Sequence, residues 1–260
     1  MKFRESLVVD VGNTETVVGW ATGPGKIAAS WRVSSSVRRT ADEMTALVGT
    51  FLDRAGVGRG RVELGVVGSV VPSANQVWMH TLRSLVAGEV LAVGPASALP
   101  IRLAVDEPLS VGADRVANTV AAKVLYRKDT IVVDLGTATT FDCIEGDGTF
   151  VGGVIAPGLN AGLEWLAERT AKLPVIEMSL PKKIIGTRTE ECMRSGVFWT
   201  AIAGVETIVR QIKDEWRRDP FVVATGGLAG VVAPSLTCVD QVEPDLTLHG
   251  LAAAGGMLTG

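Results

Sequence analysis

Cysteine is scarce in this sequence of 260 residues, and it occurs in no recognisable motif. Cys143, Cys192 and Cys238 are odd in number, widely separated and free of any C-x-x-C spacing. These features exclude a cysteine-based zinc or redox motif of the usual kind. They favour buried free thiols in a reducing compartment, so we expect a cytoplasmic protein.

Long apolar runs and an excess of positive charge are absent as well. No uncharged apolar run reaches about 18 residues, the length of a membrane span. The first residues, MKFRESLVVD, lack the apolar core and small-residue cleavage site of a signal peptide. The formal net charge of -3 gives no electrostatic reason to expect binding to DNA, RNA or an anionic membrane. The sequence therefore predicts small-molecule partners, with no nucleic acid and no membrane.

Short β-prone runs alternate with helical patterns along the chain, an order typical of α/β proteins. Thr40 is a candidate helix N-cap with Glu43 three residues later, as in a capping box. We predict strands at 7–11, 16–20, 26–32, 64–67, 89–93, from 131, and at 221–225. We predict helices from 40, over 73–86, from about 113, over 187–216 and after 248. The boundary is expected in the helix after Gly112, which gives an N-terminal domain of residues 1–115 and a C-terminal domain of residues 116–260.

The sequence builds one arrangement twice, in LVVDVGNTETVVGW (7–20) and IVVDLGTATTFDCI (131–144). In each, a β-branched run reaches an aspartate, Asp10 or Asp134, then a glycine, a small polar residue and a second β-prone run. The glycine permits a sharp turn with exposed backbone N–H groups, while a carboxylate at a strand end suits a Mg²⁺ ion shared with phosphate oxygens. Two such turns facing each other across an interdomain cleft would hold a nucleotide from both sides.

A single D-x-G-N-T segment is more simply interpreted as an ordinary turn, because Asp, Gly and Asn are common turn residues. The second copy, at the corresponding place in the other half, favours a nucleotide site. Each copy is followed by another strand rather than a helix, which argues against a dinucleotide-binding turn. The absence of G-x-x-x-x-G-K-[ST] excludes a P-loop kinase, and the protein-kinase loops are also missing.

The duplicated turn resembles the actin, Hsp70 and sugar-kinase superfamily, and further motifs narrow the resemblance to type III pantothenate kinases. The motifs, in family order, are DVGNTETVVGW from Asp10, VGADRVAN from Val111, DLGTATTFD from Asp134, GGVIAPGL from Gly152, IIGTRTEECMRSG from Ile184, ATGGLA from Ala224 and DLTLHGL from Asp245. The resemblance implies an α/β fold of two RNase-H-like (actin-like ATPase) domains with an interdomain nucleotide cleft. It also implies ATP-dependent phosphorylation of pantothenate to 4′-phosphopantothenate, the first step of coenzyme A biosynthesis.

The resemblance further implies roles for individual residues. Asp114 matches the family's general base, and Arg115 would bind polar groups of pantothenate. Gly112 and Ala113 complete this substrate segment, and Thr189 matches a substrate-binding threonine that the family supplies across the interface of a homodimer with a shared active site. The residues implied for ATP binding are Asp10, Val11, Gly12, Asn13, Thr14, Glu15, Thr16, Val17 and Thr137. Asp10 would hold Mg²⁺ through the phosphates, and Asp134 would bind a monovalent cation, K⁺ or NH₄⁺.

Structural roles are the alternatives at several of these positions. Asp114 could be an acidic residue in the first turn of a helix, and Thr189 a solvent-facing helix N-cap. The glycines of GGVIAPG and of TGG at 225–227 could serve tight packing. An apolar stripe at helical spacing could form either a dimer seam or part of the core. Its members are Val197, Ala201, Val205, Ile208 and Ile212.

Two departures from the family pattern concern the acceptor substrate. Val105 stands where many members carry a tyrosine, and GTRT differs from the commoner G-K-N-T at two interior positions. We expect these changes to act on pantothenate affinity rather than on the reaction class. The competing functions are another small-molecule kinase of the superfamily and a non-catalytic regulatory protein, since a related branch is associated with transcriptional regulation. Retention of Asp10, Asp114, Asp134 and Thr137 together favours an enzyme.

Overall fold

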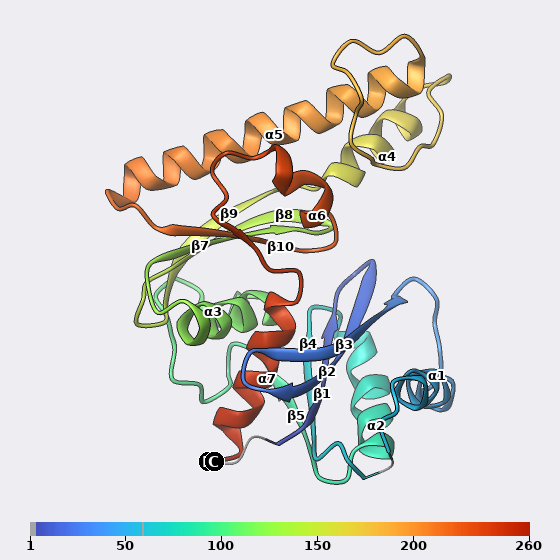
Figure 1. Ribbon diagram of the computed structural model, residues 1–260, viewed down its shortest axis with the longest axis vertical. Coiled ribbons are helices and arrows are strands. Elements are labelled where there is room, and N and C mark those ends of the chain that lie inside the picture. The colour runs from blue at the N-terminus through green and yellow to red at the C-terminus, as the bar shows by residue number, and fades with distance from the viewer. Residues whose placement is uncertain (1–3, 59) are drawn as a thin grey trace. The chain divides into compact units, whose positions relative to one another are not determined.

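The structure is a computed structural model that describes residues 4–58 and 60–260. It is an α/β protein with two sheets, and its chain forms two compact units (Figure 1). Unit 1 contains the chain up to Arg127 together with Glu145–Val151 and Asp245–Gly260, and unit 2 contains Lys128–Ile144 and Gly152–Pro244. The boundary predicted after residue 115 falls inside helix α3 (Ala113–Leu125), whereas the chain first passes from unit 1 to unit 2 between Arg127 and Lys128.

The sheet of unit 1 has the strand order β3-β2-β1-β4-β5. β1 pairs antiparallel with β2 and parallel with β4, so the first predicted strand is central. The bounds are β1 Ser6–Val11, β2 Glu15–Gly23, β3 Lys26–Ser34, β4 Leu64–Ser69 and β5 Glu89–Val93. All five strands predicted for this half are confirmed.

One face of this sheet is covered by α1 (Ala41–Arg54) and α2 (Asn75–Leu85). Alternate residues of β1, among them Val9 and Val11, are buried in a core with Met44 of α1 and Trp78 of α2. The predicted capping box is confirmed, because the Thr40 side chain accepts from the backbone N–H of Glu43 while the Glu43 side chain accepts from Thr40.

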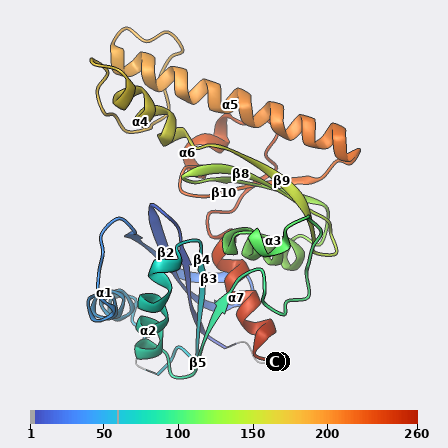
Figure 2. The ribbon, with the colours of Figure 1, turned by 180° about the vertical axis from the view of Figure 1, so that it is seen from behind.

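The other face of the same sheet is covered by α3 and by α7 (Leu246–Leu258), the last helix of the chain (Figure 2). The close approach of α7 to the sheet and to α3 depends on glycines. A Cβ at Gly68 of β4 would lie 2.8 Å from Leu251, and one at Gly250 would run into the Ala117 backbone. Unit 1 is therefore completed by residues from the far end of the sequence.

The sheet of unit 2 has the order β11-β10-β7-β8-β9, and β6 (Arg102–Leu103) pairs with Thr149 and Phe150 at the start of β9, all within unit 1. The long predicted helix is α5 (Thr189–Trp216), whose Phe198 and Val205 are buried against this sheet. The remaining bounds are β7 Thr130–Leu135, β8 Ala138–Ile144, β9 Thr149–Pro157, α4 Leu159–Arg169, β10 Phe221–Thr225, α6 Ala229–Val232 and β11 Gln241–Val242, with 3₁₀ turns at Pro72–Ala74, Pro108–Ser110 and Ala233–Ser235. In residues 4–58 and 60–260, no helix has both the length and the apolar character that a bilayer span requires.

Candidate active site

The first aspartate turn joins β1 to β2 in unit 1. Asp10 is the penultimate residue of β1, half-buried, with Val17 of β2 on one side and Gly68 of β4 on the other. The backbone N–H of Gly12 donates to the Glu15 carbonyl at 3.1 Å, and a Cβ at Gly12 would lie only 2.8 Å from that oxygen. The turn is therefore tight enough to need glycine, and it leaves Asn13, Thr14 and Glu15 exposed.

The second aspartate turn repeats this geometry in unit 2. Asp134 is the penultimate residue of β7, with Thr140 of the antiparallel β8 on one side and Thr225 of the parallel β10 on the other. The Gly136 N–H donates to the Ala138 carbonyl at 3.1 Å, and Thr137 is exposed. The two segments therefore share their strand topology and the position of the aspartate, as the sequence predicted.

Two glycines from distant segments pack against the second turn. Gly226 has φ +93°, and a Cβ there would lie 2.8 Å from Leu135 N and closer still to Asp134 Oδ1. Gly158, the N-cap of α4, would place a Cβ 2.7 Å from the Gly136 carbonyl oxygen and against that of Thr137. At these two positions the structure shows the tight packing that the sequence offered as one alternative, and the glycines pack against the candidate site itself.

Ser35, just after β3, stabilises the first aspartate turn through hydrogen bonds. Its N–H donates to the Thr14 carbonyl at 2.9 Å, and its hydroxyl lies 2.9 Å from the Thr16 hydroxyl. Thr16 is buried, so its side chain supports the turn from beneath, and Val17 follows it in β2. Sequence reasoning missed Ser35, because it lies among three consecutive serines and its partners are about twenty residues away.

The GADR segment begins α3 in unit 1. Gly112 is the N-cap, Ala113 is buried, and half-buried Asp114 lies in the first turn, where its Oδ1 accepts from the Arg115 N–H at 2.8 Å. A Cβ at Gly112 would press on Asp114 Oδ1 and lie 3.4 Å from Val70 Cγ1.

This helix start is tied to the end of β1. The Val70 N–H donates to the Val11 carbonyl at 3.0 Å, so the chain next to Gly112 is bonded to the residue after Asp10. Asp114 and the first aspartate turn therefore belong to one end of the unit 1 sheet. The Arg115 guanidinium lies over the Phe150 ring at 4.9 Å, which orients this side chain.

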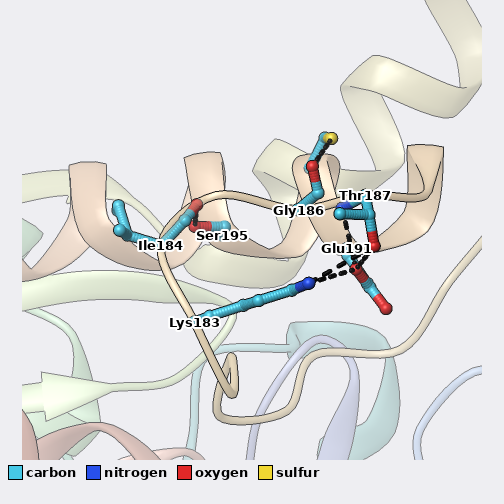
Figure 3. A network of polar contacts seen from close by, with 7 residues as sticks. Lys183, Ile184, Gly186, Thr187, Glu191 and Ser195 are labelled. Carbon is cyan, nitrogen blue, oxygen red and sulfur yellow. Dashed lines mark hydrogen bonds and ion pairs between the residues drawn. The ribbon is translucent and has the colours of Figure 1, made fainter.

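Thr189 is the exposed first residue of α5, and the segment before it is fastened to the helix (Figure 3). Thr187 donates from its N–H and its hydroxyl to Glu191 Oε2, at 2.9 and 3.1 Å. These bonds, the backbone one first, lower the pKa of the Glu191 carboxyl. Lys183 Nζ lies 3.3 Å from the Thr187 hydroxyl, and the Ser195 hydroxyl donates to the Ile184 carbonyl at 2.7 Å. These bonds hold the segment before Thr189 against α5, and the helix N-cap is Arg188 rather than Thr189.

An apolar groove of about 510 Å³ lies beside α4 and α5 in unit 2, lined by Gly162, Leu166, Val197 and Ile208 among others. Large hydrophobic side chains are exposed on the same stretch of the chain, and they include Ile155, Trp165, Val175, Ile185 and Trp199. Four members of the predicted α5 stripe, Val197, Ala201, Val205 and Ile208, line this groove. Ala201, Val205, Ile208 and Ile212 also belong to or contact the unit 2 core, so the stripe lies between the core and the groove. Within the described residues, no three His, Cys, Asp or Glu side chains gather as a metal cage.

Comparison with known proteins gives a consistent result. The family model described as type III pantothenate kinase matches residues 6–211. The type III pantothenate kinase of Moorella thermoacetica is 40% identical over 94% of this chain and 96% of its own length, and that of Syntrophotalea carbinolica is 41% identical over 94% and 96%.

Solved structures support the fold at much lower identity. The ethanolamine utilization protein EutJ of Carboxydothermus hydrogenoformans superposes with a TM-score of 0.57 at 20% identity, covering 98% of this chain and 91% of that one. A Campylobacter jejuni protein described as a Baf family transcriptional activator gives 0.58 at 16% identity, covering 95% and 96%.

Proposed function

This chain belongs to the type III pantothenate kinase family, and on that premise we propose that it transfers the γ-phosphoryl group of ATP to the primary hydroxyl of pantothenate. The product is 4′-phosphopantothenate, and the reaction opens coenzyme A biosynthesis. The observation that carries the proposal is the sequence identity of about 40% to type III pantothenate kinases, along almost the whole of this chain and of each relative. The free cysteines are compatible with a cytoplasmic enzyme.

Asp114 is proposed as the general base. Its Oδ1 is engaged by the Arg115 N–H, while its Oδ2 makes no hydrogen bond within residues 4–58 and 60–260, so that oxygen is available to an incoming hydroxyl. An alcohol is too weak an acid to ionise before attack, so the carboxylate chiefly orients the hydroxyl. As the oxygen bonds to the γ-phosphorus and the bond to ADP breaks, the proton passes to Asp114.

The two aspartate turns are proposed as the cation sites. Both offer a half-buried carboxylate at a strand end beside a glycine turn, and carboxylate oxygen is a hard donor suited to these ions. Asp10 would hold Mg²⁺ together with phosphate oxygens, and Asp134 would hold K⁺ or NH₄⁺. Cations bound there would offset the negative charge of the triphosphate, because the chain itself is acidic and cannot do so.

The ATP contacts are proposed for the exposed part of each turn. In the first turn, exposed Asn13 and Thr14 present polar groups to the phosphates, Gly12 permits the tight turn that places them, and Glu15 pairs with Arg32 at 3.5 Å. Val11, Thr16 and Val17 support this turn through β1 and β2. In the second turn, exposed Thr137 is the proposed nucleotide contact.

Pantothenate is proposed to contact the helix start from Gly112 to Arg115. The Arg115 guanidinium suits the carboxylate and amide groups of this substrate, because it offers several donors in one plane. Thr189 is proposed to complete the site from the partner protomer of a homodimer. We therefore propose that the apolar groove of unit 2 and the exposed hydrophobic side chains beside it form the dimer interface. There they would pack against the same surface of a second copy of the chain.

An ATP-consumption assay on the purified protein tests this function. Pantothenate should support turnover, whereas glycerol, simple sugars and acetate should not. Turnover that is equal or faster with one of those alternatives would assign the protein to another kinase activity of the superfamily.

A further inference from the structure

Unit 1 contains a second groove, of about 410 Å³, which shares Val11 and Thr16 with the proposed ATP turn but extends away from it toward α1 and α2. We call it the serine–arginine groove, after Ser34, Ser35, Ser36, Arg38 and Arg39 in its wall. Val11 and Trp78 also line it, and both belong to the core on the α1 and α2 side of the sheet. Asp114 and Arg115 lie on α3, which covers the opposite face, and neither lines the groove.

The charge of the groove is positive although the chain is acidic. Its lining includes two arginines and no aspartate or glutamate, while the whole chain has a formal net charge of -3. One carboxylate, Glu43, lies near Arg39, but it also accepts from the Thr40 N–H at 2.7 Å and from the Thr40 hydroxyl. Among residues 4–58 and 60–260, Arg38 forms no ion pair, and Arg39 donates one hydrogen bond, of 3.4 Å, to the Ser34 carbonyl.

The floor and the wall of the groove differ in character. Val11, Val33, Met44 and Trp78 are buried apolar side chains that form the floor, whereas serine hydroxyls and guanidinium groups form the wall. Guanidinium and hydroxyl donors suit the oxygens of a phosphate or carboxylate, and the apolar floor suits an aliphatic body. A volume of this size lies within the usual range for small-molecule pockets.

We propose that the serine–arginine groove binds an organic anion in which a phosphate or carboxylate group is attached to an aliphatic body. The site also adjoins the first aspartate turn. Ser35 lines the groove, and the same residue bonds to the Thr14 carbonyl and the Thr16 hydroxyl. A ligand that moves Ser35 therefore changes the support of the proposed ATP turn, which couples the two sites.

Direct binding without ATP tests the proposal independently of the kinase activity. The probes are hexyl phosphate and hexanoate, with 1-hexanol and inorganic phosphate as partial ligands, and the readout is the indole N–H signal of Trp78, assigned with a Trp78→Phe variant. Hexyl phosphate or hexanoate should shift this signal saturably, and each partial ligand should bind at least ten-fold more weakly. The better of the two anions identifies the charged group.

Matched variants locate the probe. Arg38→Gln combined with Arg39→Gln should weaken binding at least ten-fold, whereas Arg83→Gln, an exposed arginine of α2 outside the groove, should leave it unchanged. Asp114→Asn should bind the probe like the wild type. Unchanged binding in the double variant, equal binding of 1-hexanol, or loss of binding in Asp114→Asn would each overturn the proposal. A thermal melt of every variant checks that the fold is retained.

Discussion

Gly226 packs against the carboxylate of Asp134. Its φ of +93° lies in the region that favours glycine, and a Cβ there would approach Asp134 Oδ1 and lie 2.8 Å from both N and C of Leu135. The next residue, Gly227, would meet nothing within 4 Å. The orientation of Asp134 therefore depends on the absence of a side chain at Gly226, the residue directly after β10.

The adjacent glycines give a matched pair of variants. Gly226→Ala should displace Asp134 and remove activation by K⁺ or NH₄⁺, as Asp134→Ala should, and should also weaken ATP binding. Gly227→Ala should retain near-normal activity, because its new methyl group has free space. Initial rates in potassium, ammonium and sodium salts measure the effect. Full potassium activation in a folded Gly226→Ala enzyme would contradict the proposed role of Asp134.

Asp114→Asn should abolish most of the phosphoryl transfer and leave the fold intact. The substitution removes the proton acceptor but retains the side-chain size and an oxygen that can accept from the Arg115 N–H. Loss of a general base typically lowers the rate by about 10² to 10⁴. The measurements are kcat and the melting temperature. Unchanged kcat would limit Asp114 to its place in the first turn of α3.

Ser35→Ala should raise the KM for ATP several-fold with a smaller change in kcat, because the hydroxyl that supports Thr16 is lost while the backbone bond to Thr14 remains. Ser35→Thr should restore most of the affinity by returning the hydroxyl. Ser36→Ala is the control, since among the described residues the Ser36 hydroxyl bonds to Ser34 and not to the aspartate turn. If Ser35→Ala and Ser36→Ala have the same KM for ATP, Ser35 does not position the turn.

Mixed dimers test the shared active site. Asp114→Asn and Thr189→Ala protomers should each be inactive alone, yet one site of a mixed dimer would carry both intact residues. Coexpression of differently tagged chains, followed by two-step purification, isolates that species. It should recover a measurable fraction of wild-type activity. An inactive mixed dimer would mean that Thr189 acts within its own chain or takes no part.

Cys238 should resist alkylation at neutral pH. Burial, and after it the nearby Glu206 carboxylate, raises the pKa of this thiol to about 11, so little reactive thiolate forms below that pH. Its rate with iodoacetamide should rise about ten-fold for each pH unit up to that value. Peptide mass spectrometry, with Cys192→Ser removing the exposed thiol, measures the rate. Rapid labelling of Cys238 at pH 7 in the folded protein would contradict the expected shift.

The local patterns predicted the local structure well. Runs of β-branched residues located β1 and β7, and the Thr40 and Glu43 spacing located the start of α1, because each signal lies within a few neighbouring residues. The aspartate turns were predicted for the same reason.

Contacts between segments far apart in the chain could not be predicted, because no local sequence pattern indicates them. Nothing near Ser35 indicates that it bonds to Thr16, and Gly226 lies about ninety residues from Asp134. The inward packing of Val205 and Ile208 also depends on which side of α5 meets the sheet, a choice that helical periodicity leaves open.

The membership of α7 in unit 1 has a consequence for synthesis on the ribosome. Residues up to Arg127 emerge first, but the sheet face that Leu248 and Leu251 cover stays open until the chain from Asp245 onward is made. At roughly 5–20 residues per second, that interval is on the order of ten seconds. Unit 2 can fold while the nascent first sheet still exposes an apolar face, so chaperone protection is most needed during this interval.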